Sequence, residues 1–141
     1  MSKHKTSTPR NRYLLPSGLV VVVLIAVVTF VMLRPAASAG KKLSPADYQS
    51  QFATSNIPYL LVDVRTADEF ATGHIHGAVN IPLDTIETRL NEIPQTQPVV
   101  LYCHSGNRSG KAAQLLSSLG YKQIYDLGGI NAWAEQGYPI E

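Results

Sequence analysis

Hydrophobic residues are distributed along the chain in two ways, as one continuous run near the N-terminus and as shorter runs spaced through the remainder. The continuous run, 13–33, contains few polar residues; a basic segment, 1–12, precedes it and Arg34 follows it. About 20 apolar residues are needed to cross the hydrocarbon of a bilayer as a helix. The pattern predicts one N-terminal hydrophobic helix, either a transmembrane anchor or the apolar region of a signal peptide.

The charges around this run indicate its orientation. Positive residues ahead of it favour a cytoplasmic N-terminus, with the rest of the chain translocated. Residues 37–39, Ala-Ser-Ala, form a candidate cleavage site. We therefore expect the rest of the protein to be extracytoplasmic, either anchored in the membrane through 13–33, or secreted or periplasmic if the chain is cleaved after Ala39. Residues 34–42 are expected to be a linker.

The segment 43–141 alternates short hydrophobic runs with helical patterns. Ser44 is a candidate N-cap for a first helix. The clearest helical pattern runs from Arg108 to Leu119, where alanine and leucine recur at i, i+3, i+4 and i+7. This alternation predicts an α/β domain, a parallel sheet with helices on both faces. The strands are expected at 59–64, 78–81, 99–102 and 123–127, and the other helices at 66–71, 84–91 and 129–136.

Charge is divided unequally between the two parts of the chain. Residues 1–42 contain seven bases and no acid, whereas the remainder contains ten acids and five bases. A nucleic-acid-binding domain carries a basic surface, so the acidic composition of 43–141 argues against nucleic acid as a partner. A single cysteine allows no internal disulfide and no cysteine-rich metal site.

The single cysteine, Cys103, follows a predicted buried strand, and a helix is expected to begin about five residues later. Ligands of open α/β sheets bind at the carboxyl ends of the strands. A turn of small residues there can aim backbone N–H groups into an anion-binding nest beside the helix N-terminus, which favours a thiolate. We expect an exposed nucleophilic sulfur at Cys103 and a small anion held by the loop residues His104, Ser105, Gly106, Asn107 and Arg108.

Four stretches of this sequence resemble the rhodanese family. Residues 103–108, Cys-His-Ser-Gly-Asn-Arg, resemble its six-residue active-site loop, C-x-x-G-x-R. Residues 63–70 resemble its D-V-R-x-x-x-E-F opening. Residues 70–81 resemble its F-x-x-x-H-I-x-G-A-x-x-I element, although proline is usual where His76 stands. Residues 127–133, Leu-Gly-Gly-Ile-Asn-Ala-Trp, resemble its C-terminal glycine and tryptophan element, so the likeness covers nearly all of the predicted domain.

The resemblance implies a rhodanese-like fold and a sulfurtransferase. In such an enzyme the Cys103 thiolate takes a sulfane sulfur from thiosulfate or a similar small anion and holds it as a persulfide. An external thiol or a protein then removes this sulfur, since the chain has no second cysteine. The likeness implies no cofactor and no metal, and we expect the domain to act as a monomer.

Two other functions are considered for the same loop. The domain could be a persulfide carrier or binding module that delivers sulfur to a partner protein. It could also be a cysteine phosphatase, because the cell-cycle phosphatases resemble this fold. Their loops run Cys-x5-Arg, whereas four residues separate Cys103 from Arg108 here, and the shorter loop favours sulfur.

Several neighbouring residues are expected to have structural or secondary roles. Asp63 and Arg65 are expected to form a structural ion pair, and Trp133 is expected in the core. His104 is either a base or a loop residue that tunes substrate choice. His74 is expected to shape a turn. A zinc site from Cys103, His104, His74 and His76 lacks the spacing of structural zinc sites.

Overall fold

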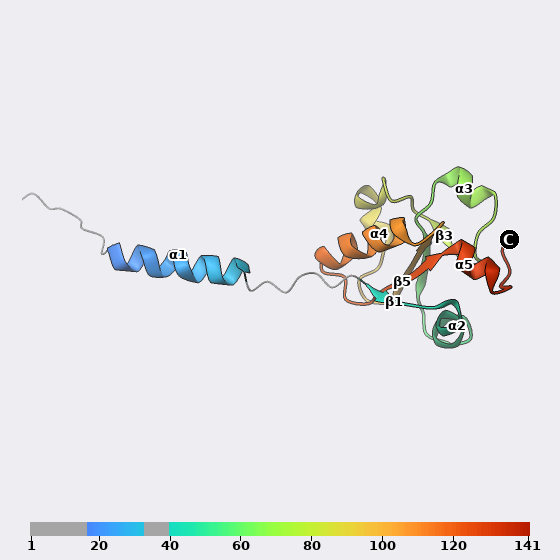
Figure 1. Cartoon of the computed structure of the whole chain (residues 1–141), viewed down its shortest axis with the longest axis horizontal. Helices are drawn as coiled ribbons and strands as arrows, with labels where there is room; N and C mark the ends of the chain where they lie inside the picture. Colours follow the sequence, from blue (N-terminus) through green and yellow to red (C-terminus); the bar gives the residue numbers. More distant parts are fainter. Residues whose placement is uncertain (1–16, 33–39) are drawn as a thin grey trace, which may run out of the picture. The chain divides into compact units, whose positions relative to one another are not determined.

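The computed structural model describes residues 17–32 and 40–141, and the chain divides into two units, 1–36 and 37–141. The first unit contains the helix α1 (Ser17–Met32), which has 16 residues (Figure 1). No helix in the described ranges combines the length and the apolar character that a membrane crossing needs. The remainder of the predicted 13–33 helix lies outside the described residues, so the anchor or signal peptide stays a prediction.

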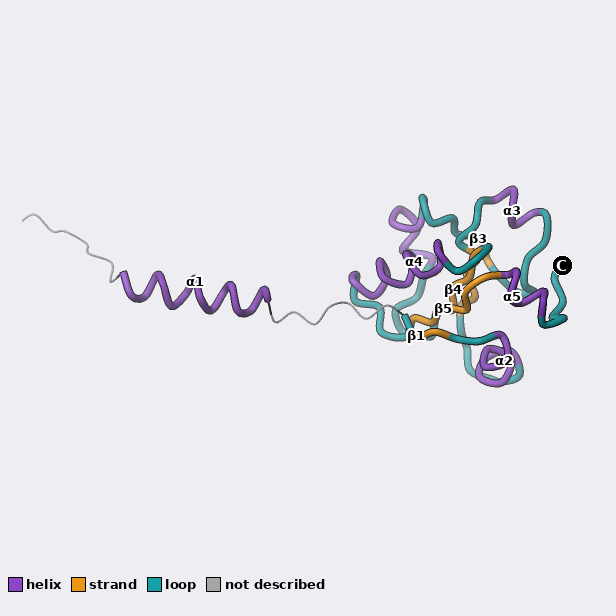
Figure 2. Tube along the Cα trace, in the orientation of Figure 1, coloured by secondary structure: helices purple, strands orange, loops and turns teal. Residues whose placement is uncertain are grey.

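Residues 40–141 are built on a five-stranded sheet in which every neighbouring pair of strands is parallel, with the order β1-β5-β4-β2-β3. Figure 2 shows the central strands β4 and β5 side by side. This confirms the predicted α/β class and parallel sheet. The strands are β1 (Lys41–Lys42), β2 (Leu60–Asp63), β3 (Val79–Asn80), β4 (Val99–Cys103) and β5 (Ile124–Gly129).

Helices cover both faces of this sheet, as predicted. Side chains alternate along a strand, so Val99, Leu101 and Cys103 of β4 face one hydrophobic cluster while Val100 and Tyr102 face the other. α4 and η2 pack on the first face, and α2, η1 and α5 on the second. These helices are α2 (Pro45–Tyr48), η1 (Gln49–Ala53), α3 (Ala67–Ala71), η2 (Ile86–Glu92), α4 (Asn107–Ser118) and α5 (Ile130–Glu135).

Two helix starts form at the capping residues that the sequence contains. The Ser44 hydroxyl accepts from the backbone N–H of Asp47 at 3.1 Å, which confirms the predicted N-cap of α2. Thr66 and Glu69 form a capping box at the start of α3, each side chain accepting from the backbone N–H of the other. This box fixes the position of the Glu69 carboxylate.

The last two residues of the predicted linker, 34–42, belong to the first strand of the sheet. Lys41 and Lys42 form β1, which pairs with Tyr125 and Asp126 of β5, and Lys42 Nζ contacts the buried Asp126 carboxylate at 2.5 Å. A two-residue edge strand is held by backbone hydrogen bonds to a neighbour far along the chain and has no hydrophobic period of its own. The earlier part of the predicted linker, 34–39, lies outside the described residues.

Candidate active site

Cys103 is the last residue of β4, and the loop that follows it leads directly into α4. Gly106 is the N-cap of α4 and has a φ of 96°, a left-handed conformation that favours glycine. This turn brings the backbone N of Gly106 to 3.1 Å from Cys103 Sγ. The Ser109 hydroxyl lies 3.7 Å from the same sulfur. One of the backbone N–H groups predicted to surround the sulfur therefore lies against it.

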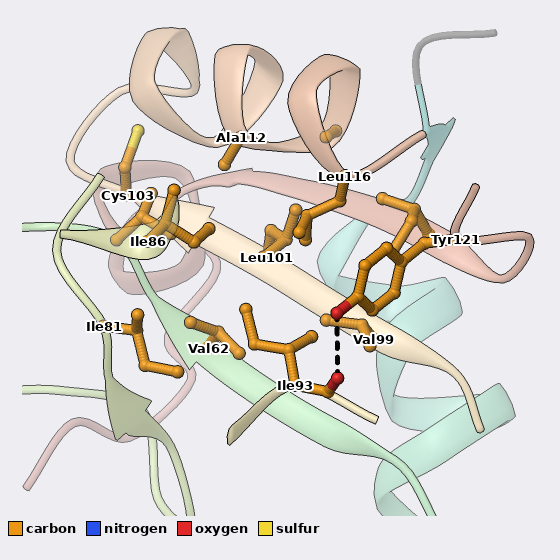
Figure 3. Close-up of a cluster of buried hydrophobic side chains, with 13 residues drawn as sticks. Val62, Ile81, Ile86, Ile93, Val99, Leu101, Cys103, Ala112, Leu116 and Tyr121 are labelled. Atoms are coloured by element: carbon orange, nitrogen blue, oxygen red, sulfur yellow. Dashed lines mark hydrogen bonds between the residues drawn. The ribbon is translucent and has the colours of Figure 1, made fainter. Parts of the chain in front are cut away.

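The sulfur is less accessible than predicted. Only 1% of Cys103 is exposed, and the residue belongs to the cluster beneath α4. In Figure 3 its sulfur points toward the first turn of α4. The expectation of an exposed thiol is wrong because β4 is covered on both faces and the loop closes around its end.

The hydrogen bonds at the sulfur outweigh the effect of its burial on ionisation. Burial raises the pKa of the Cys103 thiol, since it removes the thiolate from water. The backbone N–H and the hydroxyl of Ser109, with the backbone N–H groups of Gly106 and Ser105, lower this pKa, and the net shift is downward. A thiol with a lowered pKa is a better nucleophile near neutral pH than an ordinary cysteine.

Arg108 is already engaged with a partner that the sequence did not predict. Its two terminal nitrogens donate to the two carboxylate oxygens of Glu69, at 2.6 and 2.7 Å. These hydrogen bonds raise the pKa of Arg108 and hold the pKa of Glu69 at about 2. Arg108, which is predicted to help hold a small anion, therefore forms a bidentate ion pair with Glu69 in this structure. Glu69 lies 39 residues away, and only its place in the motif at 63–70 could have suggested a role at the site.

The outer part of the loop packs against the start of α5. His104 and Ser105 are exposed, and Asn131 Nδ2 lies 3.2 Å from His104 Nε2. At Gly129, a Cβ would meet the His104 carbonyl oxygen at 2.6 Å and Ser105 Cα at 2.8 Å. Glycine is therefore required at 129 for this contact. The motif at 127–133 already contains this glycine, but the sequence alone does not show the contact that requires it.

The remaining loop residues differ in exposure. Asn107 is exposed, and Gly106 is partly buried. Ser109 is fully buried, and its hydroxyl oxygen lies 3.2 Å from the Gly106 carbonyl oxygen, 3.3 Å from the Gly128 carbonyl oxygen and 3.7 Å from Cys103 Sγ, so its one proton has three acceptors within reach. Sequence reasoning missed Ser109 because a serine in the first turn of a helix has no distinctive pattern.

The structural roles predicted nearby are confirmed for three residues. Arg65 pairs with Asp63 at 2.6 Å, both being buried, and Trp133 is 2% exposed in the core. His74 stacks on Phe70 with ring centroids 3.8 Å apart, in keeping with a role in shaping the turn.

His76, which stands where proline is usual, contacts Glu141 Oε2 through Nδ1 at 2.8 Å. Within the described ranges, no group of three or more His, Cys, Asp or Glu side chains could hold a metal ion.

Three comparisons with known proteins agree on one family. Residues 44–136 match the family model described as Rhodanese-like domain. A sulfurtransferase of Allochromatium vinosum is 48% identical over 82 residues, which cover 57% of this chain and 77% of that protein. The thiosulfate sulfurtransferase PspE of Escherichia coli is 35% identical over 71 residues, which cover 49% of this chain and 68% of that protein.

A solved structure gives the same result. The crystal structure of a rhodanese-like domain protein from Staphylococcus aureus matches with a TM-score of 0.63 and 32% identity, covering 72% of this chain and 98% of that one.

Proposed function

The chain belongs to the rhodanese-like domain family, and we propose that it transfers a sulfane sulfur from thiosulfate or a similar donor to a thiophilic acceptor through a persulfide on Cys103. Sulfurtransferase activity is the function named for two of its relatives. The observation that carries the proposal is the set of backbone N–H groups and the Ser109 hydroxyl that surround Cys103 Sγ and lower its pKa.

The first step is a displacement at sulfur. The Cys103 thiolate attacks the outer sulfur of thiosulfate, a new S–S bond forms to Sγ, and the S–S bond of the donor breaks. Its electron pair leaves with sulfite. The negative outer sulfur of the persulfide then lies among N–H groups at the N-terminus of α4, where negative charge is stabilised.

The second step requires an acceptor from outside the chain. Cys103 is the only cysteine, so no second thiol of the protein can take the sulfur. A thiol of a small molecule or of another protein attacks the outer sulfur and regenerates the thiolate. Because one displacement is divided into two, ping-pong kinetics are expected.

Cys103→Ser tests this function directly. The variant should lose all cyanide-dependent thiocyanate formation from thiosulfate, because a serine hydroxyl does not form a persulfide. Mass spectrometry of the wild-type chain after incubation with thiosulfate should show one added sulfur on the peptide that contains Cys103. Equal thiocyanate formation in wild type and variant would contradict the proposal.

The burial of Cys103 favours a second candidate function, a persulfide carrier for a partner protein. Only 1% of Cys103 is exposed, and such burial would hinder small thiols more than a partner protein that binds over the loop. A carrier would load with sulfur as the enzyme does but would release it slowly to cyanide and to glutathione. The ratio of loading rate to turnover rate separates the two functions.

We also propose that the N-terminal segment exports the domain, either as an anchor at 13–33 or as a signal peptide removed after Ala39. The support is the basic segment before the apolar run and the Ala-Ser-Ala sequence at 37–39. N-terminal sequencing of the protein from its native cell should start at Gly40 if it is cleaved. An intact N-terminus in the membrane fraction would indicate the anchor, and an intact N-terminus in the cytosol would refute export.

A further inference from the structure

We propose that Glu69 sets the donor specificity of this site, because by pairing with Arg108 it makes the loop select donors that carry at most one negative charge and an organic group over dianionic thiosulfate. Thiosulfonates and organic persulfides are the donors of this class. The inference rests on the proposed function and names the substrate class of the same site. Glu69 would act through Arg108, as a positioning residue.

Several hydrogen bonds hold the Glu69–Arg108 ion pair in place. Glu69 accepts from both terminal nitrogens of Arg108, at 2.6 and 2.7 Å, and also from the backbone N–H and hydroxyl of Thr66, each at 3.0 Å. Its carboxylate is therefore held from two sides, by the cap of α3 and by the first turn of α4. A guanidinium has five N–H donors, and this bidentate pair occupies two of them.

The pairing reduces the net positive charge next to the sulfur. An unpaired arginine at this position would attract a dianion more strongly than a monoanion. With Glu69 in place, the two charges nearly cancel, so the loop N–H groups and the remaining N–H groups of Arg108 hold an anion without a net positive charge beside it. These suit one negative oxygen or sulfur but give no compensation for a second negative charge.

A hollow that Arg108 helps to line is large enough for an organic group. Its volume is about 260 Å³, and three of its lining residues, Val64, Pro82 and Leu83, are apolar. A cavity of about 150 Å³ holds benzene in an engineered protein core, so a phenyl group fits this hollow. Thr66 and the exposed Asp84 complete the lining with Arg108.

The transfer from such donors balances in the same way as from thiosulfate. With a thiosulfonate, the Cys103 thiolate attacks the outer sulfur, the S–S bond of the donor breaks, and a sulfinate leaves with the electron pair. With a neutral organic persulfide, the leaving group is the corresponding thiolate and the outer sulfur keeps its proton. No oxidant or reductant is needed in either case.

Glu69→Gln is the decisive variant because glutamine also completes a capping box, so α3 keeps its start while the charge is lost. The probes are thiosulfate and benzenethiosulfonate, with cyanide as the acceptor and the full chain as the protein. We expect the variant to lower KM for thiosulfate by about three- to tenfold at low ionic strength, since an unpaired Arg108 now attracts the dianion. The ratio of kcat/KM for benzenethiosulfonate to that for thiosulfate should fall by a similar factor.

Asp68→Asn is the matched control. Asp68 is the exposed neighbour of Glu69 on α3, and the substitution changes the net charge by the same amount. The donor ratio of this variant should stay within about twofold of wild type, because exposed charges are largely screened.

The outcomes separate this inference from the function on which it rests. An equal loss of kcat/KM for both donors in Glu69→Gln would mean that Glu69 only supports the fold, and it would overturn the inference. An unchanged ratio would also overturn it. If neither donor adds sulfur to wild-type Cys103, the proposed sulfurtransferase function itself fails and the inference fails with it.

Discussion

At the scale of single residues, the reactivity of the site depends on which groups stabilise the Cys103 sulfur once it is buried away from water. Cys103 is nearly fully buried, which by itself opposes ionisation. Ser109 compensates with its backbone N–H and its hydroxyl, and Gly106 adds a backbone N–H at 3.1 Å. The reactivity of the thiol therefore depends on residues that follow it within six positions.

Ser109→Ala should raise the pKa of the Cys103 thiol, because it removes the hydroxyl that lowers it. A hydrogen bond to a charged group contributes about 1.5–3 kcal/mol. The rate of alkylation by iodoacetamide is measured against pH. The midpoint of this profile should lie at a higher pH in the variant than in wild type, so alkylation at neutral pH becomes slower.

Ser118→Ala is the control for this change. Ser118 lies at the exposed end of the same helix, and its hydroxyl bonds only to the Leu115 carbonyl oxygen. Its alkylation profile should coincide with that of wild type. A Ser109→Ala profile that also coincides with wild type would show that the hydroxyl does not stabilise the thiolate.

At the scale of elements, the loop is held between two segments that are distant in sequence. α3 supplies Glu69 to Arg108, and the end of β5 supplies Gly129 beneath His104 and Ser105. The conformation of the loop therefore depends on its neighbours as much as on its own residues.

Gly129→Ala should displace the loop, since its methyl group would overlap the His104 carbonyl oxygen and Ser105 Cα. Overpacking of this kind costs about 1–3 kcal/mol. We expect a lower free energy of unfolding in urea and a sulfur-transfer rate that falls by more than the loss of folded protein explains.

Gly110→Ala tests whether any added methyl group near the site has this effect. Gly110 lies within α4, and a Cβ there would meet Asp126 Oδ2 at an ordinary 3.5 Å. Alanine in a helix is favoured over glycine by about 0.5–1 kcal/mol, so this variant should be as stable as wild type or more so. Equal behaviour of the two variants would contradict the packing role of Gly129.

At the scale of the whole molecule, the sheet determines where the chemistry lies. β4 is the third of five parallel strands, and its five residues are all buried. It delivers Cys103 to the carboxyl edge of the sheet, on the face that α4 covers. The helix N-terminus and the strand end therefore meet at one point.

The same architecture argues against phosphate chemistry. Four residues separate Cys103 from Arg108, and Arg108 is paired with Glu69. The full chain should therefore not hydrolyse p-nitrophenyl phosphate at a rate above that of Cys103→Ser. The same preparation should take up sulfur from thiosulfate, which shows that it is active. Cysteine-dependent phosphate release would revive the phosphatase hypothesis.

The features predicted correctly from sequence depend on residues close together along the chain. The Ser44 cap spans three residues, and the i, i+3, i+4 pattern gave α4 to within one residue at each end. The Cys103 loop was also predicted from six consecutive residues. In each case the interaction or the period is contained in the segment itself.

The features that sequence missed depend on contacts between distant residues. β1 exists because Lys41 and Lys42 pair with β5, more than eighty residues away. The Glu69 partner of Arg108 was missed for the same reason.

The sequence by itself determined the α/β alternation, the helix caps and the composition of the sulfur-binding loop. Local periodicity and turn formation depend only on residues that are close together along the chain. The tertiary structure decided that Cys103 is buried, that Arg108 is neutralised by Glu69, and that Gly129 supports the loop. These depend on packing and on the pairing of charges across the sheet edge, which exist only once the strands are assembled.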